Sequence, residues 1–166
     1  MGDDMEKKHI ENVEDMPVYR LFYELALKIE TMSRPFRSDF KWLRNQLLRA
    51  SESVCANMTE GFYSQYSTEY LQSLYRCRRE ARETMTHLNN AKDTHLLTVS
   101  DETLFSGYED ALRQLGNLIT SIERKIKLHG KSKPMDTLPV SSINHQPLTI
   151  DHSLFLCTPA TRLFRT

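Results

Sequence analysis

Four arginines within seven positions form the densest basic cluster of the chain. They are Arg76, Arg78, Arg79 and Arg82. On a helix, Arg78 and Arg82 share a face, as do Arg79 and Arg82. A guanidinium offers a planar fork of donors that suits phosphate oxygens, and it stacks on bases. The cluster therefore indicates either a nucleic-acid-binding face or a solvated face whose arginines pair with Glu80 and Glu83, and the residue types leave both readings open.

Three further basic residues lie earlier in the chain, on what we expect to be the preceding helix. They are Lys41, Arg44 and Arg49. If that helix packs beside the arginine cluster, these side chains extend one basic surface. We therefore take all seven basic residues as the candidate nucleic-acid-binding set.

Residues that could hold a metal or act as a nucleophile are few. Glu83 and His87 stand four residues apart, so they share a helix face. A di-iron bundle uses a Glu-x-x-His motif on each of two helices, and His95 lacks that spacing. Cys77 falls on an apolar stripe with no activating histidine in view, which favours a small hydrophobic side chain over a nucleophile. We expect no metal site and no cofactor.

Motifs that mark common enzyme classes are missing from the sequence. It has no glycine-rich phosphate loop, GxSxG elbow or HExxH, and only five glycines. The three cysteines, Cys55, Cys77 and Cys157, form no CxxC or CxxH spacing, which disfavours a zinc site or a disulfide framework. We expect a protein that is not an enzyme and that resides in a reducing cytoplasm.

The overall charge of the 166-residue chain excludes one way of binding nucleic acid. Lysines and arginines number 22, as do aspartates and glutamates. Binding of nucleic acid through a large net positive charge, as in histones, is therefore excluded, whereas binding through a local basic face is not. No run of 18 apolar residues exists, so we expect no transmembrane helix and no membrane partner. The acidic start is not followed by an apolar segment, so we expect no secretory signal.

Composition divides the chain into three parts. Residues 1–16 carry six acids against two lysines and predict a flexible acidic leader. Residues 17–130 hold nearly all of the periodic apolar pattern. Residues 131–166 contain four of the six prolines, and Pro breaks helices, so they predict a disordered or loosely docked tail.

The middle part predicts four amphipathic helices. The first runs from about 17 to 33, with Pro17 at its first position and an apolar stripe of Tyr19, Phe22, Ala26 and Ile29. The second runs from about 36 to 63, with a heptad stripe of Phe36, Phe40, Leu43, Leu47, Ala50 and Val54. Ser67 is expected to cap the third helix and Ser100 the fourth, which Gly130 closes.

Short connectors between such helices favour antiparallel neighbours. The simplest burial of four stripes is an all-α, antiparallel up-down four-helix bundle. Each large buried side chain contributes about 1.5–3 kcal/mol, enough for a stable domain of this size. A bundle whose helices pack along their whole length leaves no room for a catalytic pocket.

Two stretches of the sequence resemble a known bacterial family of four-helix bundles. Residues 49–62, Arg-Ala-Ser-Glu-Ser-Val-Cys-Ala-Asn-Met-Thr-Glu-Gly-Phe, are similar to its Asn-x-x-Glu-Gly-Phe signature. Residues 75–88 are similar to its Arg-Gly-x-x-x-Glu-Thr-x-x-x-Leu pattern, and Tyr23 to Ala26 fit its first helix. The family is that of the 23S ribosomal RNA intervening-sequence proteins, related to the accessory variability proteins of diversity-generating retroelements.

The resemblance covers roughly residues 17–129 and carries functional expectations. It implies a ring-like homopentamer and, for retroelement members, binding of a reverse transcriptase and of RNA or DNA. Arg79 stands where relatives often have Gly, which bears on how subunits approach. In a ring, a modest basic cluster recurs in every subunit, so weak sites add through multivalency.

Asn57, Glu60 and Gly61 carry the family signature at the end of the second helix. They form either a polar recognition spot or a structural helix end, where Asn57 and Glu60 bond neighbouring backbone and Gly61 takes a positive φ. We favour the structural interpretation.

An alternative function follows from apolar residues expected on the outside. They are Trp42, Phe62, Tyr63 and Tyr66. Such residues suit a protein-protein interaction scaffold that binds no nucleic acid. Both functions hold together if assembly creates the nucleic-acid surface.

Overall fold

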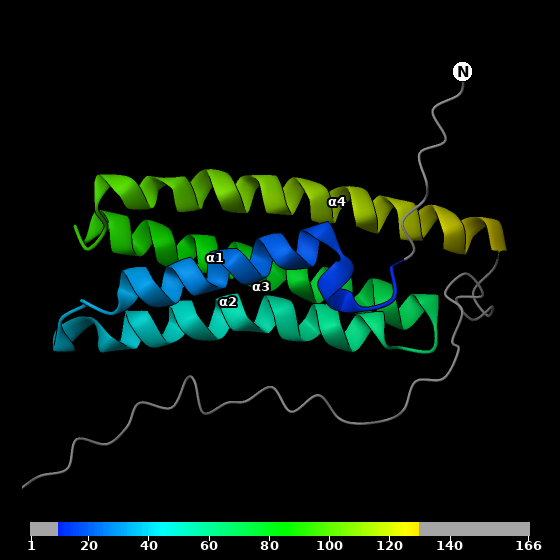
Figure 1. The fold of residues 1–166 in the computed structure, drawn as a ribbon, viewed down its shortest axis with the longest axis horizontal. Helices are drawn as coiled ribbons and strands as arrows, with labels where there is room; N and C mark the ends of the chain where they lie inside the picture. Colours follow the sequence, from blue (N-terminus) through cyan, green and yellow to red (C-terminus); the bar gives the residue numbers. More distant parts are fainter. Residues whose placement is uncertain (1–9, 130–166) are drawn as a thin grey trace, which may run out of the picture.

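Four long helices lie lengthwise against one another in the computed structural model, which describes residues 10–129 apart from the side chains at 99, 100 and 129 (Figure 1). They are α1 (Pro17–Ser33), α2 (Lys41–Phe62), α3 (Ser67–Asp93) and α4 (Thr103–His129). Short 3₁₀ helices precede three of them: η1 (Val13–Asp15), η2 (Ser38–Phe40) and η3 (Val99–Glu102). The described residues form no strand.

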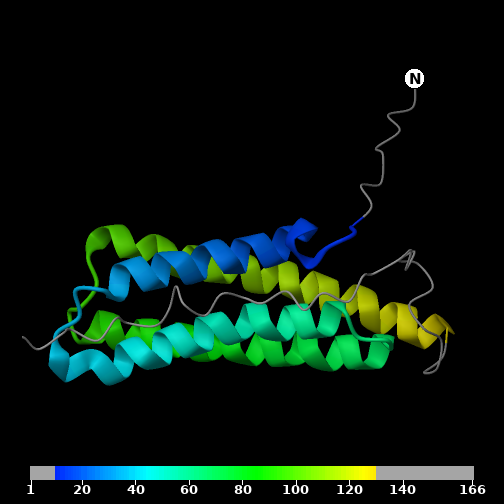
Figure 2. The ribbon, with the colours of Figure 1, turned by 60° about the horizontal axis from the view of Figure 1, so that its bottom comes forward.

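The order of packing defines an up-down bundle. The α2–α3 contact is the most extensive, and α1–α2, α3–α4 and α1–α4 also pack, so α1 and α3 lie on a diagonal (Figure 2). The predicted all-α antiparallel four-helix bundle is confirmed. The expected tail, residues 131–166, and the expected cap at Gly130 lie outside the described residues. No helix of the described part is both long and apolar enough to cross a bilayer.

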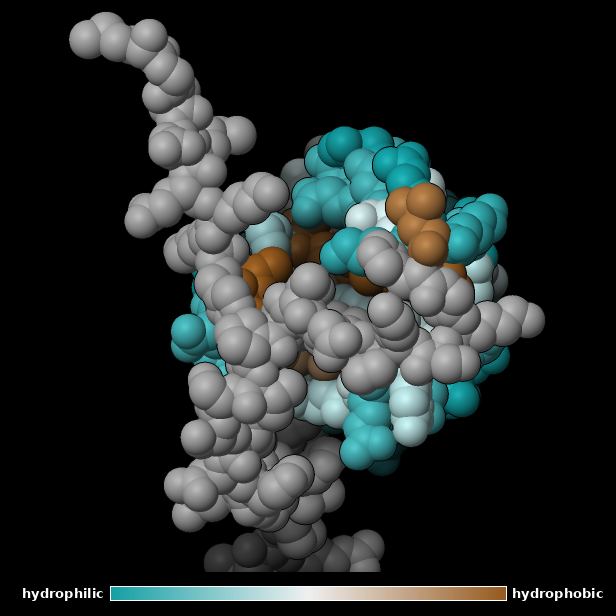
Figure 3. Space-filling model, turned by 90° about the vertical axis from the view of Figure 1, so that its right-hand side faces the viewer, coloured by the Kyte–Doolittle hydropathy of each residue, from teal (hydrophilic) through white to brown (hydrophobic). Residues whose placement is uncertain are grey.

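The core follows the helical period closely. Leu47, Leu74 and Leu115, from α2, α3 and α4, are fully buried. On α1 the buried apolar residues are Val18, Phe22, Leu25 and Ile29. Tyr19 and Ala26, expected in that stripe, are only half-buried, because the stripe centres one residue earlier. Seen from one end, hydrophilic side chains surround apolar ones (Figure 3).

Helix starts differ from the expected positions. Phe36 and Phe40 are half-buried but precede α2, because Ser38–Phe40 form a 3₁₀ turn first. Ser67 is the first residue of α3 rather than its cap, which is Tyr66. Thr98, not Ser100, makes the capping box before α4, and its N–H donates to Asp101 Oδ2 at 2.7 Å.

The segment before α1 is part of the packed body from residue 13 at the latest. Val13 is fully buried and Met16 nearly so, and both belong to the core cluster. Arg20 of α1 holds the turn in place, because its guanidinium donates to the Glu14 carbonyl and pairs with Asp15 at 3.2 Å. Part of the expected flexible leader of residues 1–16 is therefore structural.

The turn after α3 contains a residue with a strained backbone. His95 has φ 57°, in the left-handed region. The N–H of Leu96 donates to the Ala91 carbonyl at 2.9 Å, and that of His95 to Lys92 at 3.0 Å. These two bonds define a Schellman motif, in which glycine normally takes the place of His95.

Candidate nucleic-acid interface

The α3 arginine row, defined as Arg76, Arg78, Arg79 and Arg82, lies on the outer side of α3. All four side chains are exposed, whereas Cys77, Glu80 and Ala81 between them are buried. The helical period therefore places the core stripe and the arginines on different sides of α3. The row is the solvent-facing surface that the sequence predicts.

Two arginines of the row are engaged in ion pairs. Arg79 pairs with the buried Glu80 at 3.1 Å, and Arg76 pairs with Glu60 of α2 at 3.7 Å. Arg79 is 72% exposed, so water screens its pair and keeps the guanidinium accessible. Glu80 therefore pairs with an arginine of the row, as expected if the row is a solvated face.

The other two arginines keep their charge uncompensated. Neither Arg78 nor Arg82 has an ion pair with any of the residues from 10 to 129. Arg78 lies over the Tyr75 ring, 5.1 Å from its centroid. The Tyr75 hydroxyl donates to Glu123 of α4, and this hydrogen bond is the main reason that the pKa of Tyr75 is raised. The Tyr75 ring therefore packs against the Arg78 guanidinium, and the hydrogen bond of its hydroxyl to Glu123 links this part of α3 to α4.

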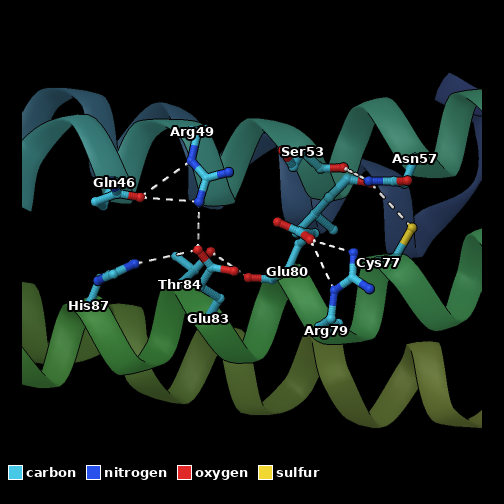
Figure 4. Close-up of polar contacts among 11 residues, drawn as sticks. Gln46, Arg49, Ser53, Asn57, Cys77, Arg79, Glu80, Glu83, Thr84 and His87 are labelled. Carbon is cyan, nitrogen blue, oxygen red and sulfur yellow. Dashed lines mark hydrogen bonds and ion pairs between the residues drawn. The ribbon is translucent and has the colours of Figure 1, made fainter.

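The basic residues of α2 do not form one surface with the row. Arg49 reaches across to Glu83 of α3 at 2.8 Å (Figure 4). Arg44 turns instead to Glu30 of α1 at 3.6 Å. Lys41 is exposed at the start of α2. Arg49 therefore lies toward α3, whereas Arg44 lies toward α1. Glu83 pairs with Arg49 of α2 and not with an arginine of the α3 arginine row.

The α2–α3 interface contains polar groups that are satisfied within the fold (Figure 4). Asn57 Nδ2 donates to the Ser53 carbonyl at 2.7 Å, and Cys77 Sγ donates to the Val54 carbonyl at 3.3 Å. The bond from Asn57 fits the structural interpretation of the family signature. Glu60 instead points outward to Arg76, since its side chain is 68% exposed.

The expected positive φ at Gly61 is wrong. Gly61 lies inside α2, and its backbone has no left-handed φ. A Cβ built on it would stand 2.6 Å from the Cβ of Ser73. Gly61 is therefore needed for the close approach of α2 and α3, not for a helix cap.

Glu83 and His87 meet as their spacing predicts. His87 Nε2 lies 3.6 Å from Glu83 Oε1, buried and without a hydrogen-bond partner among the described atoms. The same carboxylate oxygen binds Arg49, so its charge is already matched. His95 was expected in a helix and instead occupies the turn after α3. Within residues 10–129, no three metal-binding side chains gather.

Cys55 and Cys77 are free thiols buried between the helices. Burial raises the pKa of each thiol to about 12, well above its ordinary value of 9.0. Both therefore stay protonated at neutral pH, and a thiol is a poor nucleophile in that form. Cys77 occupies the core position that the sequence predicts.

Large apolar side chains remain exposed on three helices. Trp42 is 52% exposed, and Tyr63 and Tyr66 are also exposed, as predicted. Phe62 is buried instead, because it faces the core at the last turn of α2 and packs edge-on against Tyr63. Tyr23 and Leu27 are also exposed, on the outside of α1, and were not predicted from the sequence. Their four-residue spacing, which places both on one helix face, was the available signal.

These features define an all-α protein of the up-down four-helix class, whose outer surface rather than an enclosed cavity carries the distinctive side chains. The model of the 23S rRNA-intervening sequence protein family matches residues 14–121. The chain therefore belongs to the 23S rRNA-intervening sequence protein family. No curated protein matches it.

Proposed function

We propose that this protein is a non-enzymatic helical accessory protein that binds RNA or DNA through the α3 arginine row. One observation carries the proposal: Arg78 and Arg82 share a face, are exposed, and have no carboxylate partner among the described residues. Free guanidiniums on a rigid helix lose little freedom when they bind phosphate.

The arrangement suits phosphate contact better than base reading. Tyr75 holds Arg78 on one side, whereas Arg79 keeps most of its surface in water despite its bond to Glu80. Side chains of this kind bind the nucleic-acid backbone and position it without specifying sequence. The binding is therefore expected to be salt-dependent and tolerant of sequence.

Filter binding at low salt tests the proposal. Wild-type protein should retain single-stranded RNA or DNA, and the double variant Arg78→Ala with Arg82→Ala should bind at least about tenfold more weakly. The matched control is Lys28→Ala with Lys127→Ala, which removes the same charge from exposed positions of α1 and α4. Absence of binding, or equal loss in both variants, would reject the proposal.

Assembly and a protein partner form the second part of the proposal. Tyr23 and Leu27 stand one turn apart on α1 and are each about half exposed, so they form an apolar patch on the outside of the bundle. Self-association into a ring and docking of a reverse transcriptase, as the family resemblance implies, would use such residues. A mass measurement of the intact assembly at micromolar concentration tests this part, and a monomer would contradict it.

The exposed apolar residues also favour the alternative of a protein-binding scaffold without nucleic acid. That alternative predicts a stable assembly together with no retention of RNA or DNA at low salt. The filter-binding and mass measurements together therefore decide between the two functions.

A further inference from the structure

A second concentration of basic residues lies in the segment that leads into α2 and in the first half of that helix. Residues 34–51, called here the α2 basic segment, contain five basic residues and a single acid, Asp39. The basic residues are Arg34, Arg37, Lys41, Arg44 and Arg49. Glu30 and Glu83 supply two further carboxylates by ion pairs, which still leaves five cations against three acids.

Helix stability does not explain these charges. The first turn of α2 contains no acid, although acids there would complement the positive end of the helix dipole. Lys41 is the first residue of α2, and Arg44 stands one turn on. Cations at this end weaken the helix slightly, which points to a use outside the folding of the bundle.

The only tryptophan of the chain stands within this segment. Trp42 is 52% exposed, follows Lys41 directly, and lies outside the core cluster. Arg49 is seven residues on, so it lies within about 20° of Trp42 around the helix and about 10 Å further along it. Trp42 and Arg49 therefore share one outward face of α2.

The guanidinium of Arg49 is held toward the Trp42 end of that face. Its Nε and one terminal nitrogen donate to Gln46 Oε1 at 3.3 and 3.1 Å, and Gln46 is one turn from Trp42 (Figure 4). The same terminal nitrogen also donates to Glu83 Oε1 at 2.8 Å. The Arg49 side chain is still 61% exposed, so donors remain for a ligand.

We propose that Trp42 is a stacking platform for an unpaired base of a single-stranded nucleic acid, with Lys41 and Arg49 binding the flanking phosphates. An aromatic ring flanked by cations is the combination that binds single strands, because every base has a face to stack and every nucleotide a phosphate. A duplex keeps its bases inside the stack and cannot use the ring. This inference rests on the proposed nucleic-acid function and specifies its ligand as single-stranded.

Because Trp42 is the sole tryptophan, its fluorescence reports on this site alone. Full-length protein is titrated with a twelve-nucleotide thymidine oligomer and with a twelve-base-pair duplex at low salt. The single strand should quench Trp42 fluorescence with the same midpoint as its binding, measured separately by anisotropy of a labelled strand. The duplex should leave the fluorescence nearly unchanged.

Variants separate stacking from folding. Trp42→Ala should weaken single-strand binding about 5- to 100-fold, whereas Trp42→Phe, which keeps an aromatic face, should bind within about threefold of wild type. The matched control is Tyr63→Ala, which removes an exposed aromatic residue from the opposite end of α2. It should change binding less than twofold, and all variants should melt as wild type does.

These experiments distinguish a failure of the stacking inference from a failure of the proposed nucleic-acid function. Single-strand binding without quenching, or with an unchanged affinity in Trp42→Ala, overturns the stacking inference and leaves the nucleic-acid function standing. Equal quenching by the duplex also overturns it. Absence of binding to either probe rejects both, and points to a protein partner for this surface.

Discussion

Gly61 of α2 and Ser73 of α3 approach so closely that a Cβ on Gly61 would stand 2.6 Å from the Cβ of Ser73. A Cβ cannot rotate away, so Gly61→Ala must push the two helices apart along their most extensive contact. We expect a loss of about 1–3 kcal/mol in the free energy of unfolding, measured by urea denaturation. An unchanged midpoint would show that the helices are not packed this closely.

Gly116 provides the opposite case on α4. A Cβ built there meets nothing within 4 Å, so the bundle gives no packing reason for glycine. Gly116→Ala should raise the free energy of unfolding by about 0.5–1 kcal/mol, because alanine favours the helix. Denaturation at two protein concentrations measures the gain. A loss of stability would mean that another chain approaches α4 at this position.

His95 has an energetically unfavourable, left-handed backbone conformation in the turn between α3 and α4. Glycine adopts that conformation freely, so His95→Gly should stabilise the protein by about 0.5–1 kcal/mol. His95→Ala keeps the Cβ and should bring no gain, which makes it the matched control. Urea midpoints of the three proteins test the prediction, and equal midpoints for the glycine and alanine variants would refute it.

The buried thiols predict a loss of stability at alkaline pH. Cys55 and Cys77 have a pKa of about 12 in the folded protein, whereas the ordinary value is 9.0. Their contribution is complete below pH 9 and declines as the pH rises from 9 toward 12, because the unfolded chain ionises first. Burial also raises the pKa of Tyr70 and Tyr108, in the same direction.

Urea midpoints at about pH 8, 9.5 and 11 measure this decline. A variant carrying Cys55→Ala and Cys77→Ala should be less stable at pH 8 but should lose less on going to pH 11. If wild type and variant decline in parallel, the buried thiols are not the cause.

The helices were predictable because their signals are local. The first helix begins at Pro17 and ends at Ser33 as expected, and Leu47 of α2 and Leu74 of α3 are fully buried. Helix starts were less accurate, because Ser38–Phe40 take a 3₁₀ turn that an apolar pattern does not distinguish from α-helix. Burial of Val13 was missed because the surrounding acids dominate the composition of that segment.

The exposure of the α3 arginine row was predictable from the sequence, whereas the arrangement of the candidate residues around it was not. That the α3 arginine row faces water follows from the helical period. The pair of Arg49 with Glu83, and the turn of Arg44 toward Glu30, depend on the register between helices, which no single helix encodes. The role of Gly61 was misread for the same reason, since its constraint comes from Ser73 on another helix.

The salt dependence of single-strand binding tests the central claim most directly. Each phosphate neutralised contributes about 0.7 to the slope of log affinity against log salt. If Arg78 and Arg82 each bind a phosphate, the variant carrying Arg78→Ala and Arg82→Ala should bind more weakly, with a slope shallower by about 1.4. The control Lys28→Ala with Lys127→Ala should keep the wild-type slope. Identical slopes for wild type and the α3 variant, or no binding at low salt, would contradict the account.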